Sequence, residues 1–179
     1  MKALSPKLQS RLANIKLFIC DVDGVLTDGA IFIGGSREIK RFNIHDGLGL
    51  VLLRRAGIKT AWVSSRPSPA TTLRARELKI TFLVQQKDKL SKTAAIEKIL
   101  AREKLNWEDV CFVGDDIVDL GPLEKAGVGA AVDNAVDEAK AAADYVTHAA
   151  GGHGAVREMV ELILKAQGKW ASIITAYRE

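Results

Sequence analysis

A short apolar run near the start of the chain ends in two carboxylates that are separated by one residue. The run is Leu17-Phe-Ile-Cys20, and Asp21, Asp23 and Gly24 follow it. Such a run predicts a buried strand, and the glycine lets the backbone turn tightly away after it. Two like charges this close repel each other unless a cation neutralises them or one carboxyl keeps a proton. The sequence therefore predicts a metal-assisted site, with one acid as nucleophile and its neighbour as proton shuttle.

The acid pair has a simpler alternative explanation, an Asp-rich turn that caps the next segment. A calcium loop of the EF-hand type is excluded by its spacing. Val25 occupies the third ligand position of such a loop, and Phe32 stands where the loop requires its closing glutamate. The choice between a turn and a catalytic site depends on whether the rest of the chain completes the site.

A second apolar run, Val110–Val113, also ends in acids: Asp115 and Asp116 follow it closely, and Asp119 lies one helical turn further on. Mg²⁺ prefers oxygen ligands and usually takes one or two protein carboxylates, a requirement that Asp21 and Asp115 would meet. The alternative is that these acids begin a helix, where they would complement its dipole. That alternative stays open for Asp119, but capping explains single acids better than two matching strand ends.

Apolar strands alternate with helical segments along the chain. This alternation predicts an α/β fold, a Rossmann-like parallel sheet with helices on both faces, in which ligands bind beyond the carboxyl ends of the strands. Both acidic clusters fall at that edge. We expect strands at 15–20, 58–63, 80–84, 110–113, 128–132 and 145–147, and helices near 46–56, 68–78, 88–104, 119–126, 135–143 and 154–167.

Residues 30–44 interrupt the alternation. Two apolar stretches flank the turn Gly34-Gly-Ser36, a pattern that predicts a β-hairpin projecting from the sheet. A projecting hairpin is marginal alone, so we expect it to pack against other subunits; the alternative is packing on its own core. The apolar side chains concerned are Ile31, Ile33, Ile39, Phe42 and Ile44.

The spacing of the elements limits the domain organisation. About twenty residues separate the first acid pair from the next helix, which is too few for a separate cap domain. We expect one domain over residues 1–179, with the hairpin at about 30–44 and a C-terminal tail at about 168–179. The apolar residues of this tail either cover a neighbouring active site or extend the last helix; they are Trp170, Ile173, Ile174 and Tyr177.

A hydroxyl and a lysine follow two other predicted strands. Ser64 and nearby backbone N–H groups would bind a phosphate oxygen, and Arg66 adds a planar cationic fork. Lys89 lies at the start of a helix, where its ammonium would offset charge on a phosphate and on the nucleophile, with Lys87 as a competitor. Taken singly, such a serine is usually a cap and such a lysine is usually solvated. Their order along the chain, between the two acidic clusters, favours the catalytic interpretation.

Composition excludes several classes of protein. A hydrophobic content of 47% and a charged content of 27% are typical of globular chains, which argues against disorder or a fibrous fold. The net charge of +4 favours anionic small molecules, and the basic residues are too dispersed to indicate nucleic-acid binding. Cys20 and Cys111 lie inside apolar strands, as expected of reduced thiols. Without a signal peptide or a membrane-spanning run, the chain is expected in the cytoplasm, with no membrane partner.

The whole chain resembles the haloacid dehalogenase superfamily of aspartate-nucleophile phosphotransferases. Its four motifs match Asp21-Val-Asp23, Ser64, Lys89 and Gly114–Asp119. Segments 21–29, 42–49, 150–158 and 166–169 are more narrowly similar to the 3-deoxy-D-manno-octulosonate 8-phosphate phosphatases. That resemblance implies Mg²⁺ as cofactor, a homotetramer, a small capless fold, and a step in making the sugar acid of lipopolysaccharide.

The resemblance also implies roles for individual residues. It gives catalysis to Asp21, Asp23, Ser64 and Lys89, and substrate contacts to Asp23, Asn43, His45, Asp46, Gly47, Arg66, Arg74 and Lys89. Metal ligation falls to Asp21, Asp115 and the backbone carbonyl of Asp23. Asp116 and Asp119 would orient the metal ligands and the lysine. Three positions depart from the family pattern. Ser65 replaces a common glycine, and His45 and His153 stand where Arg or Lys is frequent.

Other functions stay open at this point. A phosphatase for another nonulosonate or sugar phosphate would use the same catalytic groups. A phosphoaspartate signalling receiver also combines acidic strand ends, a hydroxyl, a lysine and Mg²⁺, but its phosphorylated Asp ends a middle strand, whereas this acid pair follows the first. A noncatalytic binding role would be favoured by loss of Asp21 or Asp23, and both are present.

Overall fold

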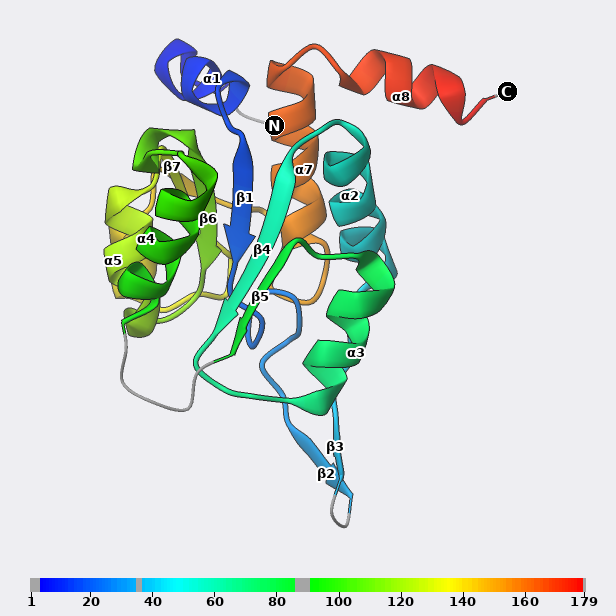
Figure 1. The fold of residues 1–179 in the computed structure, drawn as a ribbon, viewed down its shortest axis with the longest axis vertical. Helices are drawn as coiled ribbons and strands as arrows, with labels where there is room; N and C mark the ends of the chain where they lie inside the picture. Colours follow the sequence, from blue (N-terminus) through cyan, green and yellow to red (C-terminus); the bar gives the residue numbers. More distant parts are fainter. Residues whose placement is uncertain (1–3, 35–36, 86–90, 179) are drawn as a thin grey trace.

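The computed structural model describes residues 4–34, 37–85 and 91–178 (Figure 1). Six of its strands are β1 Leu17–Cys20, β4 Lys59–Ser64, β5 Phe82–Gln85, β6 Val110–Gly114, β7 Val128–Ala131 and β8 Tyr145–Val146. They form one parallel sheet in the order β5-β4-β1-β6-β7-β8. The α/β fold class and the six strands expected from the sequence are confirmed.

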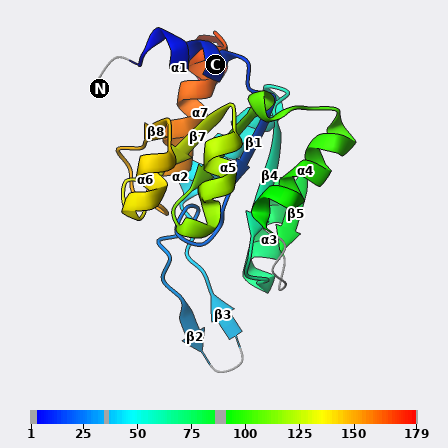
Figure 2. The same cartoon turned by 90° about the vertical axis from the view of Figure 1, so that its left-hand side faces the viewer.

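Helices cover both faces of this sheet. The helices are α1 Pro6–Ala13, α2 Ile44–Arg55, α3 Pro69–Leu78, α4 Lys92–Glu103, α5 Leu120–Lys125, α6 Asp137–Ala142, α7 Ala155–Ala166 and α8 Trp170–Ala176, with short 3₁₀ turns η1 Trp107–Asp109 and η2 Ile117–Asp119. Helices α2 and α7 pack together on one face, and α4 and α5 on the other (Figures 1 and 2). The predicted helix 88–104 is described only from residue 91 onward.

Strand β1 lies at the centre of the sheet, where the order of strands changes direction. Cys20 at its end is in register with Trp62 of β4 and Val113 of β6, so the three strands finish close together. Parallel sheets bind ligands at the position where the strand order reverses, beyond the carboxyl ends of the strands. The chain leaves β1 at Asp21, which places the first acid directly at this point.

One hydrophobic core joins the sheet to both helical layers. The side chains of β1 and β6 are fully buried, as are Trp62, Met159 and Ile163. In α7 the buried residues recur at helical spacing and face the sheet and α2. The two cysteines are free and buried, and no helix in the described part of the chain has the length and apolarity to cross a bilayer.

The predicted hairpin is present, with its second strand shorter than expected. Strands β2 Phe32–Gly34 and β3 Arg37–Ile39 pair antiparallel and project from the sheet (Figures 1 and 2). The second strand was expected to reach residue 44, but it ends at Ile39. The Lys40 side chain turns inward, and Phe42 stacks on Trp62 at a centroid distance of 6.1 Å, so the chain leaves the ribbon there.

Both ends of the chain form helices: α1 was not predicted, and the tail forms the separate helix α8 instead of extending the last helix. Ser5 caps α1 by accepting a hydrogen bond from the Leu8 amide, and Pro6 occupies its first turn. Helix α8 follows Gly168, whose positive φ of 66° ends α7. It lies at the opposite end of the molecule from the hairpin, so it does not cover the acids of its own chain (Figure 1).

Candidate active site

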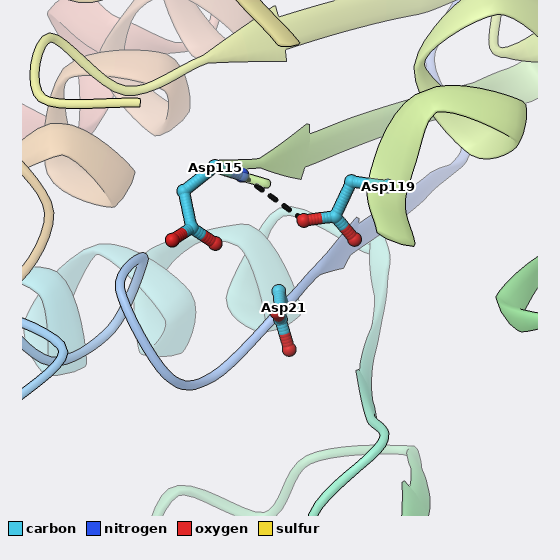
Figure 3. Close-up of side chains that lie close together, drawn as sticks. All are labelled: Asp21, Asp115 and Asp119. Atoms are coloured by element: carbon cyan, nitrogen blue, oxygen red, sulfur yellow. Dashed lines mark hydrogen bonds between the residues drawn. The ribbon is translucent and has the colours of Figure 1, made fainter. Parts of the chain in front are cut away.

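Three carboxylates converge at the carboxyl ends of β1 and β6 (Figure 3). Asp21 follows β1, Asp115 follows β6, and Asp119 ends the 3₁₀ turn η2. One oxygen from each lies within 4.8 Å of the others. The predicted meeting of the two acidic clusters is therefore confirmed in the fold.

Lys92, the first residue of α4, provides an ammonium group for this cluster. Its Nζ lies 2.7 Å from Asp21 Oδ2 and 2.6 Å from Asp119 Oδ1, and its side chain is buried. Burial works against the charge, but the two carboxylates outweigh it and raise the pKa of Lys92. Sequence reasoning selected Lys89 instead, which lies outside the described residues and stays a prediction. The available signal for Lys92 was its place just after the helix cap Ser91.

One ammonium does not balance three carboxylates in the described part of the site. Burial, together with Asp119, outweighs Lys92 and raises the pKa of Asp21 to about 6. Burial and the charges of Asp21 and Asp119 raise the pKa of Asp115 to about 8. These acids hold protons more tightly than usual because they are removed from water and lie beside other carboxylates.

The carboxylate oxygens of Asp115, Asp116 and Asp119 differ in their hydrogen-bond partners. Asp119 Oδ1 accepts from Lys92, and its Oδ2 accepts from the Asp115 amide at 3.0 Å, so both oxygens are occupied. Asp115 Oδ1 is buried without a hydrogen-bond partner among the described residues. Asp116 is exposed and caps η2 through the Ile117 amide. A hard divalent cation therefore fits Asp21 and Asp115, while Asp119 organises the loop.

Glycines allow the loop after β1 to approach these acids closely. Gly24 has a φ of +89°, and a Cβ at this position would lie 2.0 Å from Asp115 Oδ2. A Cβ on Gly151 would lie 1.6 Å from the Gly24 carbonyl oxygen. The segment at 150–154 thus packs directly on the loop that carries Asp21 and Asp23.

Asp23 lies at the base of the hairpin, where Lys40 contacts it. The Lys40 Nζ donates a hydrogen bond of 2.6 Å to Asp23 Oδ1. Lys40 also lies 3.6 Å from Glu38, which in turn pairs with Arg66. The sequence did not point to Lys40 or Glu38, because a hairpin lysine is normally solvated and Asp23, which accepts its hydrogen bond, lies 17 residues away.

Ser64 ends β4 as predicted and is buried. Its hydroxyl accepts a hydrogen bond of 3.1 Å from the Arg66 amide and also contacts the Arg66 carbonyl. This arrangement forms a tight turn that directs the Arg66 side chain toward the hairpin. Ser65, which replaces a glycine of the family pattern, is exposed.

The predicted substrate residues of α2 fall into two groups. Asn43 caps α2 by accepting a 2.8 Å hydrogen bond from the His45 amide, and His45 is exposed. Asp46 is 1% exposed, and its Oδ1 accepts from the Arg157 amide at the start of α7. Asp46 therefore ties α2 to α7, and its predicted contact with substrate stays a prediction.

Gly47 and Arg74 are brought together by the packing of α2 on α3. A Cβ on Gly47 would lie 2.4 Å from Arg74 Nη2, so the absent side chain makes room for the guanidinium. Arg74 Nη1 donates a 2.7 Å hydrogen bond to Glu77, and its Nε is buried without a partner in the described structure. The guanidinium keeps unused donor capacity.

Comparison with known proteins identifies the family. Residues 85–159 match the model of the haloacid dehalogenase-like hydrolases. A 3-deoxy-D-manno-octulosonate 8-phosphate phosphatase from Salmonella typhimurium is 40% identical over 93% of this chain and 88% of its own length. The chain belongs to this phosphatase family. Another member, from Yersinia pestis, is 42% identical over 89% of this chain and 84% of its own length.

A solved structure of the phosphatase family shares this fold closely. The enzyme from Moraxella catarrhalis, in complex with magnesium ion, phosphate ion and KDO, aligns with a TM-score of 0.92 and 37% identity. The alignment covers 97% of this chain and 99% of the other. The family resemblance inferred from the motifs is thus confirmed by sequence and by structure.

The raised pKa values predict how stability depends on pH and metal. The unfolded acids titrate near 3.8, whereas Asp21 and Asp115 titrate near 6 and 8 in the fold. The native state then holds more protons, so without metal the free energy of unfolding should fall as pH rises from about 4 through 8. Mg²⁺ replaces these protons, so its stabilising effect should grow over that range.

Urea unfolding at pH 5 and pH 8, with and without Mg²⁺, measures this effect. The Asp115→Asn variant should lose most of the increase in Mg²⁺ stabilisation. The Asp137→Asn variant, at an exposed position on α6, should retain it. Equal stabilisation by Mg²⁺ at both pH values in the unsubstituted protein would contradict the charge assignment.

Proposed function

We propose that this chain is a cytoplasmic, Mg²⁺-dependent phosphoric monoester hydrolase of lipopolysaccharide biosynthesis. Its substrate is 3-deoxy-D-manno-octulosonate 8-phosphate, and its products are the free sugar acid and phosphate. The observation that carries the proposal is the cluster of Asp21, Asp115 and Lys92 at the carboxyl edge of the sheet. Relatives named for this reaction match along nearly the whole chain and support the choice of substrate.

Asp21 is the proposed nucleophile. Its carboxylate attacks phosphorus, the bond from phosphorus to the sugar oxygen breaks, and an aspartyl-phosphate forms. Mg²⁺ would be held by Asp21, Asp115 and the backbone carbonyl of Asp23, where it would offset negative charge on the carboxylate and the phosphate. Lys92 lies against Asp21 and supports the same charge balance from the protein.

Asp23 is the proposed proton carrier. It gives a proton to the departing sugar oxygen and later takes one from the water that attacks the aspartyl-phosphate. That attack breaks the bond from phosphorus to Asp21 and releases phosphate. Ser64, with Lys89 as a further candidate, would hold the non-bridging phosphate oxygens.

The Asp21→Asn variant tests the nucleophile directly. An amide is a poor nucleophile and a weaker metal ligand, so kcat should fall by roughly 10³-fold or more while the fold is retained. The matched variant Asp137→Asn should retain normal kcat. Steady-state phosphate release with saturating Mg²⁺ and circular dichroism measure both properties. Near-normal turnover by Asp21→Asn would refute the assignment.

Two arginines with unused hydrogen-bond donors support the choice of substrate class. A sugar-acid phosphate carries a carboxylate remote from its phosphate, which a guanidinium binds through two charge-assisted hydrogen bonds. Arg66 Nη1 and Arg74 Nε have no hydrogen-bond partner in the described structure. A phosphatase for another nonulosonate phosphate is the second candidate, because His45 and Ser65 depart from the family pattern.

A substrate panel tests this choice. We expect kcat/KM for 3-deoxy-D-manno-octulosonate 8-phosphate to exceed that for glucose 6-phosphate by at least ~10-fold, or about 1.4 kcal/mol of transition-state binding. Arg66→Ala and Arg74→Ala should each reduce this preference, since the substrate carboxylate loses a partner. The exposed Arg76→Ala variant of α3 serves as control. Equal rates on both phosphates would exclude the acid-sugar specificity.

The hairpin supports a homotetramer as the working form. Four isoleucines at its strands and base are exposed, whereas Phe42 packs on the chain's own core; the four are Ile31, Ile33, Ile39 and Ile44. Exposed apolar side chains gathered on one projection mark an interaction surface. We propose that copies of this hairpin bury one another in the assembly.

Light scattering tests the assembly. The unsubstituted protein should have the mass of four chains, and the double variant Ile33→Lys, Ile39→Lys should dissociate, because burying the added charges is costly. Leu73→Lys, which alters an equally exposed apolar residue of α3, should leave the mass unchanged. A monomeric unsubstituted protein would contradict this proposal.

A further inference from the structure

Lys40 carries a buried ammonium group at the base of the hairpin. Its side chain is 1% exposed, and its Nζ lies 2.6 Å from Asp23 Oδ1 and 3.6 Å from Glu38 Oε1. Burying an ammonium costs several kcal/mol unless carboxylates compensate for the lost water. The chain nevertheless leaves the β-ribbon at this residue to place the ammonium against these two acids.

This contact distinguishes the two oxygens of Asp23. Oδ1 accepts the hydrogen bond from Lys40, whereas Oδ2 is shielded from solvent and has no partner in the described part of the chain. A carboxyl that transfers a proton needs one oxygen free to meet the reacting group and a fixed orientation for that oxygen. We propose that Lys40 is a positioning residue that holds Oδ1, so that Oδ2 exchanges the proton with the leaving group.

The inference rests on the proposed function, in which Asp23 is the proton donor. When the bond from phosphorus to the sugar oxygen breaks, that oxygen keeps the electron pair and takes the proton from Asp23 Oδ2. Asp23 is then a carboxylate whose Oδ1 still accepts from Lys40. No further reactant is required for this step.

The same lysine connects Asp23 to the proposed substrate arginine. Glu38 Oε2 accepts a hydrogen bond from Arg66, and its Oε1 faces Lys40. Burial opposes ionisation of Glu38, but hydrogen bonds from Arg66 and Ser68 and the charge of Lys40 lower its pKa. Strand β3 thus fixes the spacing between the proton donor and the group proposed to bind the sugar carboxylate.

Leaving groups of different basicity test the proposal. The ratio kcat/KM covers steps up to the first irreversible one, the transfer of the phosphoryl group to Asp21. A sugar alkoxide must be protonated as it leaves, whereas the p-nitrophenolate of p-nitrophenyl phosphate is stable as an anion. In Lys40→Met, kcat/KM for the sugar-acid phosphate should fall at least ~10-fold further than kcat/KM for p-nitrophenyl phosphate.

A fraction of unfolded protein lowers kcat/KM for both phosphates by the same factor, so it does not affect the comparison. The quantity compared is kcat/KM for the sugar-acid phosphate divided by kcat/KM for p-nitrophenyl phosphate. Lys40→Gln retains a hydrogen-bond donor, so it should lower this quotient by less than Lys40→Met does. Asp23→Asn should give the largest decrease. Lys59→Met is the matched control. Lys59 also pairs with a glutamate, Glu103, but it lies at the opposite end of β4 from Ser64.

Two outcomes separate the inference from the function on which it rests. A folded Lys40→Met enzyme whose kcat/KM values for the two phosphates fall by factors within about twofold of each other would overturn the positioning role. An unsubstituted enzyme that hydrolyses neither phosphate with Mg²⁺ would refute the proposed function instead.

Discussion

The geometry of the site depends on the charge balance among three carboxylates, two buried and one half-buried, and one buried ammonium. Parallel strands β1 and β6 end side by side, so Asp21 and Asp115 are forced together with Asp119 close behind. Lys92 compensates for part of this charge, and burial together with the neighbouring carboxylates raises the pKa values of Asp21 and Asp115. A protein can hold such a cluster only if protons or a cation complete it. The fold therefore creates an affinity for cations at the carboxyl ends of β1 and β6.

Close backbone packing keeps this cluster in register. Gly24 and Gly151 bring the loop after β1 and the segment before α7 into direct contact, where any side chain would collide. The loop cannot retreat from Asp115 without disturbing that contact. On the other side, Lys40 links the hairpin to Asp23. The acid pair is thus held by elements that are distant in sequence, which explains how this sheet supports a fixed geometry.

The strands and the acidic clusters could be predicted because apolar runs and carboxylate spacing are local signals. The contact of Lys92 with Asp21 and Asp119 could not be predicted from the sequence, since it depends on the path of the backbone into α4. Lys40 was missed because its burial depends on acids elsewhere in the chain. For Asp46, the hydrogen bond from the Arg157 amide could not be predicted from the sequence, and the substrate contact that the family motif implies stays a prediction.

Calorimetric titration of Mg²⁺ in two buffers of different ionisation enthalpy tests the central claim most directly, because it counts the protons that leave as the metal binds. With the pKa of Asp115 raised to about 8, this acid is largely protonated at pH 7. We predict that about one proton is released per bound ion at pH 7, and that release disappears in Asp115→Asn. Binding of Mg²⁺ without proton release, or no binding, would contradict the claim that a cation completes this cluster.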